Sequence, residues 1–172
     1  MDVVSMGSRH EHRHPCEIIA FYVGIAYNTG MTTPHIVLDT NILIAAQRSQ
    51  RGASAKLLSL VGIGLFDLHL SAALVLEYED VLLRYRAELG LTQDDVEDLV
   101  DALCALSTPH EIYYRWRPYL RDPGDEFVLE LAVAAGCDYI FTFNKRDFTN
   151  VERFGIQPLT PGEFLKVVGA AP

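Results

Sequence analysis

Four polar side chains of this chain have the types and the placement that a cation site needs. Asp39 and Asn144 each come directly after a short apolar run that predicts a β-strand. Asp125 opens a predicted helix, and Glu77 lies early in another. In an open parallel sheet the functional crevice lies beyond the carboxyl ends of the strands. If the two helices pack beside the first strand, three carboxylates and an amide meet in one cleft.

Carboxylates gathered in this way favour a bound divalent cation. At close range they raise one another's pKa and resist joint ionisation, a conflict that a cation removes. Magnesium and manganese prefer oxygen ligands and need only one or two direct carboxylates, with substrate phosphate completing the shell. The cation lowers the pKa of a bound water, orients it for in-line attack and neutralises charge on the phosphate. An acidic cluster without His or Cys therefore indicates phosphodiester chemistry.

Each acid also has a purely structural interpretation. Asp39 is a suitable N-cap for a helix that starts at the next residue. Glu77 belongs to an acidic run typical of a solvated helix face, and periodicity does not distinguish it from Glu79. Asp122 is a suitable cap, and Asp125 in a first helical turn gains about 0.3 to 1 kcal/mol from the helix dipole. Individually, these signals are weak.

The elements that must position these residues alternate between strand and helix. From residue 31 onward, short apolar runs separate helical patterns, which predicts βαβ units and a largely parallel sheet. Strands are predicted at 35–38, 65–70, 110–114, 139–143 and 156–159. Helices are predicted at 41–47, 54–61, 71–86, from 92 to about 105, from 122 to about 136, and from 160 onward.

Length and charge limit the class of protein. A chain of 172 residues fits one compact domain. The net charge of -9 argues against binding nucleic acid through a broad basic surface, so any such contact must be local or assisted by metal. The 3 cysteines contain no CxxC pair and predict reduced thiols in the cytoplasm.

The N-terminal part of the chain has a different composition. Residues 1–30 combine spaced histidines with an apolar stretch at 16–27 that is too short to cross a bilayer. We therefore expect an N-terminal extension at 1–30, no membrane association, and a functional domain at 31–172.

Four runs of residues, taken in order, resemble the PIN domain. They are 36–41, 71–77, 122–126 and 141–148. Their order and spacing are similar to those of prokaryotic PIN-type toxin components of toxin–antitoxin systems, and the resemblance covers residues 35–165. It implies an α/β/α sandwich with a central parallel sheet, Mg²⁺ or Mn²⁺ at an acidic site, and endoribonuclease activity on RNA.

The resemblance also implies a role for each site residue. Asp39, Glu77 and Asp125 match the three acids of the family and would be both catalytic and metal-binding, with Asp122 as an accessory acid. Many members have Asp at the position of Asn144, and this departure leaves open whether a second metal binds.

Neighbouring residues would support this centre or meet the RNA. Thr40, Asn41 and Thr142 are expected to support the acids, and Asp147 either substitutes at the fourth position, caps or faces solvent. The candidates for contact with the RNA backbone are Lys145, Arg146, Arg115 and Arg117.

The alternatives come from other classes of protein. A haloacid dehalogenase phosphatase needs a second Asp where this chain has Asn41, and the placement of Gly62 and Gly64 disfavours a dinucleotide-binding module. A PIN-like module that binds RNA or protein without catalysis stays open, since Asn144 points in that direction. Similar toxins form homodimers and are silenced by an antitoxin protein, so both partners are expected here.

Overall fold

The protein is built on one sheet of five parallel strands, in the order β3-β2-β1-β4-β5. The computed structural model describes residues 33–115 and 117–168. The strands are β1 (His35–Leu38), β2 (Asp67–Ser71), β3 (Thr108–His110), β4 (Tyr139–Phe141) and β5 (Gln157–Leu159). The predicted α/β class with a central parallel sheet is confirmed. The expected N-terminal extension at 1–30 lies outside the described residues.

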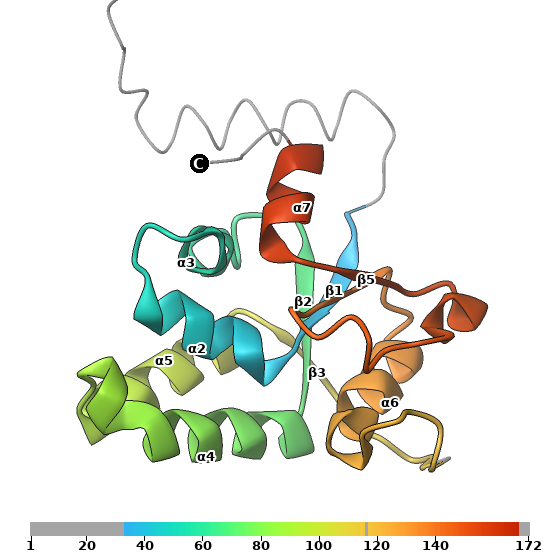
Figure 1. The fold of residues 1–172 in the computed structure, drawn as a ribbon, viewed down its shortest axis with the longest axis horizontal. Helices are drawn as coiled ribbons and strands as arrows, with labels where there is room; N and C mark the ends of the chain where they lie inside the picture. Colours follow the sequence, from blue (N-terminus) through green and yellow to red (C-terminus); the bar gives the residue numbers. More distant parts are fainter. Residues whose placement is uncertain (1–32, 116, 169–172) are drawn as a thin grey trace, which may run out of the picture.

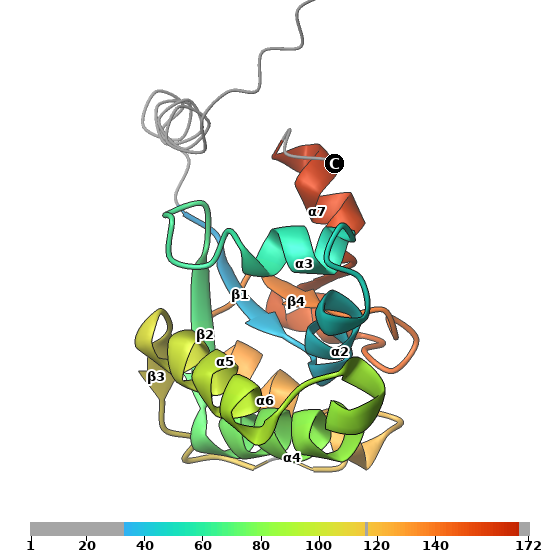
Figure 2. The same ribbon diagram turned by 90° about the vertical axis from the view of Figure 1, so that its left-hand side faces the viewer.

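Helices flank this sheet on both sides. They are α2 (Thr40–Arg48), α3 (Ala53–Leu58), α4 (Ala72–Leu89), α5 (Gln93–Ala105), α6 (Glu126–Ala134) and α7 (Pro161–Val167), with short 3-10 turns η1 (Pro123–Asp125) and η2 (Val151–Phe154). Figure 1 shows α2 and α3 on one side of the strands and α6 on the other. α4 and α5 pack against each other, and α2 contacts both α4 and α3 (Figure 2).

Capping residues set where the helices begin and end, as the sequence predicts. The Ser71 hydroxyl accepts a 3.3 Å hydrogen bond from the amide of Leu74 at the start of α4. Gly90 ends this helix in the left-handed conformation, with φ of 70°, which glycine adopts without steric cost. Thr92 and Asp95 form a reciprocal capping box at the start of α5.

The third strand departs from the prediction. It runs over Thr108–His110 and not over 110–114, and it pairs with β2 through His69 and Thr108. The side chains of Tyr113 and Tyr114 are 81% and 83% exposed, so the aromatic run after the strand is not buried by the sheet. Pro109 is tolerated because β3 is an edge strand with no further neighbour to receive its missing N–H.

Aromatic rings fill one side of the sheet. The Phe164 ring of α7 lies 4.8 Å from that of Phe141 on β4 and 5.7 Å from that of Phe66, measured between centroids. All three rings are buried, which for a phenylalanine contributes about 1.5–3 kcal/mol. This packing fixes the end of β4, where the first polar residues of the site stand. Among the described residues, no helix is long and apolar enough to span a membrane.

Candidate metal centre at the carboxyl edge of the sheet

Asp39 stands where β1 ends and α2 begins. Its amide donates a 2.9 Å hydrogen bond to the carbonyl of Phe141, which continues the pairing of β1 with β4. Its side chain caps α2 by accepting from the amide of Asn41. The residue is only 5% exposed. Asp39 is therefore both a helix cap and a buried carboxylate at the predicted edge.

The two carboxylate oxygens of Asp39 differ in the length of the hydrogen bonds that they accept. Oδ2 accepts hydrogen bonds of 2.5 Å from Asn41 Nδ2 and 2.6 Å from Thr142 Oγ1. Oδ1 accepts only longer contacts, 3.3 Å from Thr40 Oγ1 and 3.4 Å from the Asn41 amide. Oδ1 thus keeps the capacity for a stronger ligand.

The end of β4 is tied to the end of β1 through side chains. The fully buried Thr142 hydroxyl accepts hydrogen bonds from Asn41 Nδ2 at 3.2 Å and from the Asn144 amide at 2.9 Å. The Phe143 amide donates to Asn41 Oδ1 at 3.3 Å. These bonds place the exposed Asn144 next to the residues that hold Asp39.

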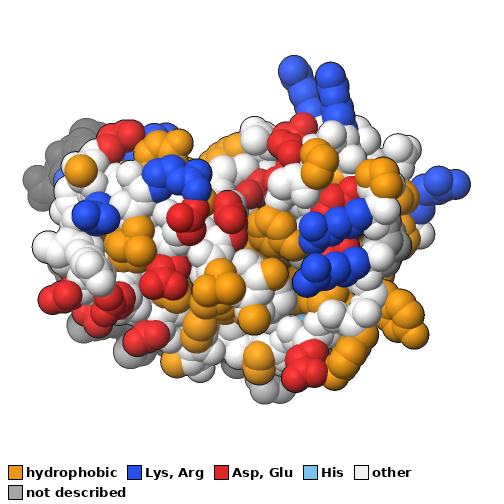
Figure 3. Space-filling model, turned by 90° about the horizontal axis from the view of Figure 1, so that it is seen from below, with side chains coloured by type: hydrophobic (Ala, Val, Ile, Leu, Met, Phe, Trp, Pro, Cys, Tyr) orange, Lys and Arg blue, Asp and Glu red, His pale blue; other side chains and the backbone are white. Residues whose placement is uncertain are grey.

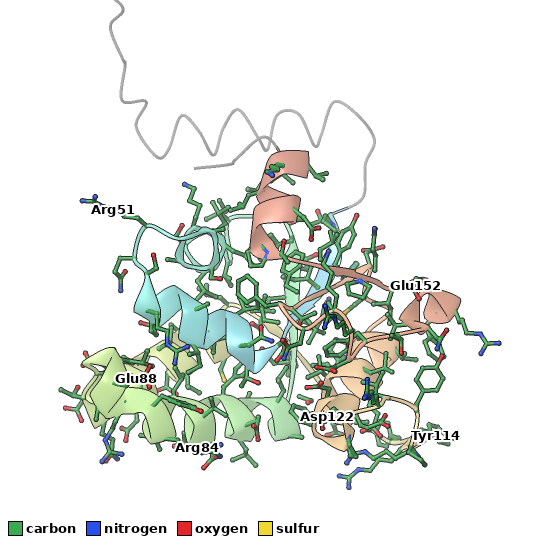
Figure 4. The ribbon with its side chains drawn as sticks, viewed as in Figure 1. Arg51, Arg84, Glu88, Tyr114, Asp122 and Glu152 are labelled. Carbon is green, nitrogen blue, oxygen red and sulfur yellow. The ribbon has the colours of Figure 1, made fainter. Side chains whose placement is uncertain are left out.

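The third acid enters from η1 at the start of α6. Asp122 caps this turn by accepting a 2.8 Å hydrogen bond from the Gly124 amide, and Figure 4 shows its side chain beside α6. Asp125 ends the turn and is partly buried. Glu126 holds the segment that precedes η1. Its carboxylate accepts hydrogen bonds from the backbone amides of Tyr119 and Leu120, at 2.5 Å and 2.9 Å.

The charges of neighbouring aspartates raise the pKa of Asp125 and of Asp39. The pKa of Asp125 is raised to about 7, first by burial and then by the charges of Asp39, Asp122 and Asp147. The pKa of Asp39 is also raised, mainly by burial and to a smaller extent by Asp147, against the lowering effect of the Thr142 hydrogen bond. Such mutual repulsion is what a bound cation relieves.

Asp147 reaches this group through a turn after β4. Its amide donates a 2.9 Å hydrogen bond to the carbonyl of Asn144, which folds the chain back on itself. The charge of Asp147 then acts on both Asp39 and Asp125. Of the roles that the sequence leaves open for Asp147, this placement favours the one next to the acids.

Glu77 is the one predicted acid that the structure does not join to the others. It lies on α4, which contacts α6, yet it forms no hydrogen bond or ion pair with the described residues. The carboxylates that raise the pKa of Asp125 are other residues. Within the described part of the chain, no three Asp, Glu, His or Cys side chains converge closely enough to enclose a metal ion.

The basic candidates divide into paired and exposed side chains. Arg117 binds the buried Glu130 through two 3.0 Å contacts, and Lys145 pairs with Glu163 at 2.5 Å. Arg115 and Arg146 are exposed and form no ion pair with any described residue. Figure 3 shows Lys and Arg side chains on both halves of this face, with acidic side chains interspersed among them. Arg115 and Arg146 are thus the RNA candidates whose charge is not shared with an acid of the described residues, and Arg117 and Lys145 stay candidates that would exchange their acid for phosphate.

Tyr78 is a site residue that sequence reasoning missed. Its hydroxyl donates a 2.5 Å hydrogen bond to the Leu38 carbonyl, directly before Asp39, and the side chain is fully buried. Burial, followed by the charge of Asp39, raises the pKa of Tyr78 well above its usual value. Its position in an acidic run on a predicted helix hid it, because only the tertiary structure brings α4 onto the end of β1.

The residues present fit an oxygen-ligated divalent cation. Asp39 Oδ1 has capacity for a ligand, Asp125 holds a carboxylate whose ionisation is opposed by its neighbours, and Asn144 offers a neutral oxygen. In comparisons with known proteins, the sequence profile described as PIN domain matches residues 35–146. This span is more than half of the chain and includes all of these residues. No curated protein matches the chain.

Proposed function

The chain belongs to the PIN-domain family, whose members are generally nucleases and typically use divalent metals, and we propose that it is a Mg²⁺- or Mn²⁺-dependent endoribonuclease. The observation that carries this proposal is that the charge of Asp39, at the end of β1, raises the pKa of the partly buried Asp125, at the start of α6, although the two residues are distant in the sequence. Carboxylates that oppose each other's ionisation at this edge have a direct use in holding a cation.

Asp39 and Asp125 would hold the cation, with Asp122, Asp147 and Asn144 as further oxygen donors. When bound, the cation supplies a water of lowered pKa and neutralises charge on the phosphate. A neutral amide at Asn144 contributes less attraction than a carboxylate, so we propose one firmly held cation. Glu77 would be a further ligand on the basis of the PIN resemblance alone, because no hydrogen bond or ion pair among the described residues joins it to the other acids.

The neighbouring residues orient Asp39 and favour its charged form. Hydrogen bonds from Thr142 and Asn41 to Oδ2 stabilise the charged carboxylate, while Oδ1 accepts only longer contacts. The buried Tyr78 hydroxyl fixes the Leu38 carbonyl just before it. A cation ligand that is held in this way needs little reorganisation when the substrate arrives.

RNA would approach along the exposed side chains of Arg115 and Arg146. Both lie on segments that lead into the acidic residues, one before η1 and one after β4. With a net charge of -9, the chain must attract RNA through such local contacts and through the cation. The exposed rings of Tyr113 and Tyr114 beside Arg115 add surfaces on which unpaired bases can stack.

We also propose the narrower role of a toxin in a toxin–antitoxin pair, acting in the cytoplasm as a homodimer that a cognate antitoxin silences. The order and spacing of the four PIN-like runs support this role. An apolar groove lined by Val75, Leu76 and Pro109, with Leu76 65% exposed, provides a surface for a protein partner. Co-purification with the product of an adjacent short reading frame tests the pairing, and a lone monomer without such a neighbour argues against it.

The test of catalysis is cleavage of single-stranded RNA in the presence of Mn²⁺. The wild type should cleave, and Asp39→Asn should lose about a hundredfold or more, because removing a cation ligand removes several kcal/mol of transition-state stabilisation. Asp98→Asn is the matched control, since Asp98 is an exposed acid on α5, outside the candidate metal centre. Equal activity in wild type and Asp39→Asn would refute the assignment.

A second candidate is a PIN-like module that binds RNA or protein without cleaving it. Asn144 favours this candidate, because a neutral side chain stands where many family members have an acid. RNA binding by a protein that shows no cleavage with Mg²⁺ or Mn²⁺ would select it.

A further inference from the structure

Three histidines form a continuous row across three strands, away from the acidic residues. Nδ1 of His35 on β1 lies 2.7 Å from Nε2 of His69 on β2, and Nδ1 of His69 lies 2.7 Å from Nε2 of His110 on β3. The ring centroids are 4.9 Å and 4.8 Å apart. The strand register puts the three side chains on one face of the sheet, in a diagonal line.

The middle of the row is closed to water. His69 is 4% exposed, and both of its ring nitrogens are used within the row, whereas His35 and His110 are partly exposed. No described buried side chain is left with an unsatisfied nitrogen or oxygen. The protons of His69 must therefore be exchanged through its two neighbours.

The geometry fixes how many protons the row can hold. Each N···N contact needs one proton, because two bare nitrogens repel and two N–H groups facing each other clash. The three neutral rings carry three protons, of which two fill the contacts and one sits on an outer nitrogen of His35 or His110. One further proton fills the other outer nitrogen and leaves both contacts intact. Any proton beyond that puts two N–H groups into one contact.

We propose that the His35–His69–His110 row is a binding site for a single proton, and that a second proton breaks the row and releases the edge strand β3 from β2. The consequence is an acid-sensitive attachment of β3. This strand leads through residues 111–121 to η1, so its release also loosens the path to Asp122 and Asp125. The proposal does not depend on nuclease activity.

The charged groups around the row do not supply a compensating anion at its centre. Burial, followed by the charges of His110 and His35, lowers the pKa of His69, and Asp67 opposes this. The Asp138 carboxylate accepts a hydrogen bond from the backbone amide of His35.

On the two helices packed against β2, the acids of α6 near the sheet are engaged, and the unpaired Glu77 of α4 lies beyond the first turn of its helix. On α6, Glu126 is engaged by backbone amides and Glu130 by Arg117. The first charged residue of α4 is Glu77, well along from its start at Ala72. Asp67 is therefore the acid whose charge favours protonation of His69, and its effect is smaller than the opposing effects of burial and of the two neighbouring histidines.

The experiment measures the pH dependence of the unfolding equilibrium in EDTA between about pH 4.5 and 5.5, where histidines of the unfolded chain with a pKa of about 6.5 are protonated. The unfolded chain takes three protons on these side chains and the folded row takes one. The row should therefore raise the unfolding constant about a hundredfold for each unit by which the pH falls.

Two variants change the number of protons that the histidines take up on unfolding, and so test this count. His69→Asn removes the centre, so that His35 and His110 each take a proton in the folded state, and the contribution of these residues to the slope should vanish. His110→Gln leaves a pair that holds one extra proton, so its contribution should be about tenfold per pH unit. His10, His12 and His14 are present in all three proteins and cancel in the comparison, as do the carboxylates.

The proposal predicts that the number of protons taken up on unfolding rises by one from His69→Asn to His110→Gln, and by one more from His110→Gln to wild type. Parallel slopes in all three would overturn it, because they mean that the histidines titrate independently, and a difference of three protons between wild type and His69→Asn would overturn the single-proton count. If His69→Asn does not fold, ring ¹⁵N spectra of the folded wild type replace it and must show one proton taken up by the row.

Discussion

The Thr142 hydroxyl donates a 2.6 Å hydrogen bond to Oδ2 of Asp39, across 103 residues of sequence. Thr142 follows β4 and Asp39 follows β1, which are neighbouring parallel strands, so the bond lies at the edge where the sheet ends. The Thr142 hydroxyl also accepts a hydrogen bond from the backbone amide of Asn144. One buried hydroxyl therefore organises the first acid of the site and the residue at its fourth position.

Replacing Thr142 with Val should lower both stability and activity. The change keeps the shape of the side chain but removes a hydrogen bond to a charged group, which contributes about 1.5–3 kcal/mol. It should also raise the pKa of Asp39 further, because the Thr142 bond opposes the effect of burial. Urea unfolding and RNA cleavage measure the two effects. Thr142→Ser keeps the hydroxyl and should stay close to wild type; equal losses in both variants would contradict the role of the hydroxyl.

The contribution of Asp125 to the stability of the metal-free protein should fall as the pH rises from about 4 to about 7. The pKa of Asp125 is about 7 in the folded state and about 3.9 in an unfolded chain, so over this range the folded state keeps a proton that the unfolded state has lost. This contribution is zero below both values and constant above them. Asp125→Asn should remove it and stabilise the protein more at pH 8 than at pH 4.

Thermal unfolding in EDTA at both pH values measures this difference. Mn²⁺ should reduce the advantage of Asp125→Asn, because the cation stabilises the charged carboxylate in the wild type. If the substitution had the same effect at both pH values, the pKa of Asp125 would not be raised in the folded protein. Asp98→Asn, which changes an exposed side chain on α5, serves as the control.

Tyr78→Phe should destabilise the protein by about 1–3 kcal/mol, because the Leu38 carbonyl loses its buried partner while the ring still packs. The phenol is fully buried and donates to this carbonyl at the end of β1. Chemical unfolding measures the loss. Tyr85→Phe is the control, since the Tyr85 side chain is 38% exposed. The same small effect in both variants would show that the Tyr78 hydroxyl does not hold the strand end.

Arg115→Gln and Arg146→Gln should each weaken RNA binding without affecting folding. Both guanidinium groups are exposed and form no ion pair with the described residues, so each is available to one phosphate. Each change should reduce the slope of log K against log salt by about 0.7, the value for one contact to a single strand. Arg84→Gln, whose side chain pairs with Asp80 on α4, is the control. An unchanged salt slope in both variants would remove these residues from the interface.

Much of the fold follows from local sequence signals, and the exceptions have physical reasons. Thr92 with Asp95 marks the start of α5, and Ser71 marks that of α4, because caps act within one helical turn. The sequence predicts the third strand at 110–114 because Ile112, Tyr113 and Tyr114 are residue types that favour strands, whereas the pairing partner that selects Thr108–His110 lies on β2, far away in the sequence.

The residues of the candidate site also divide into those that the local sequence predicts and those that only the tertiary structure brings together. Asp39 was identifiable because it directly follows an apolar run, and the structure puts it at the strand end. The contribution of Asp147 depends on the turn after β4, and that of Tyr78 on how α4 crosses β1, neither of which periodicity reveals. The histidine row is invisible in the sequence for the same reason, since its members are brought together only by strand order.

The most direct test of the central claim is a crystal of the protein soaked in Mn²⁺, with the metal located by its anomalous scattering. Joint binding by Asp39 and Asp125 predicts one strong peak about 2.1 Å from Asp39 Oδ1 and from an Asp125 carboxylate oxygen. Crystals of Asp39→Asn should lack this peak. The absence of a peak in the wild type, or a peak that touches neither aspartate, would contradict the account.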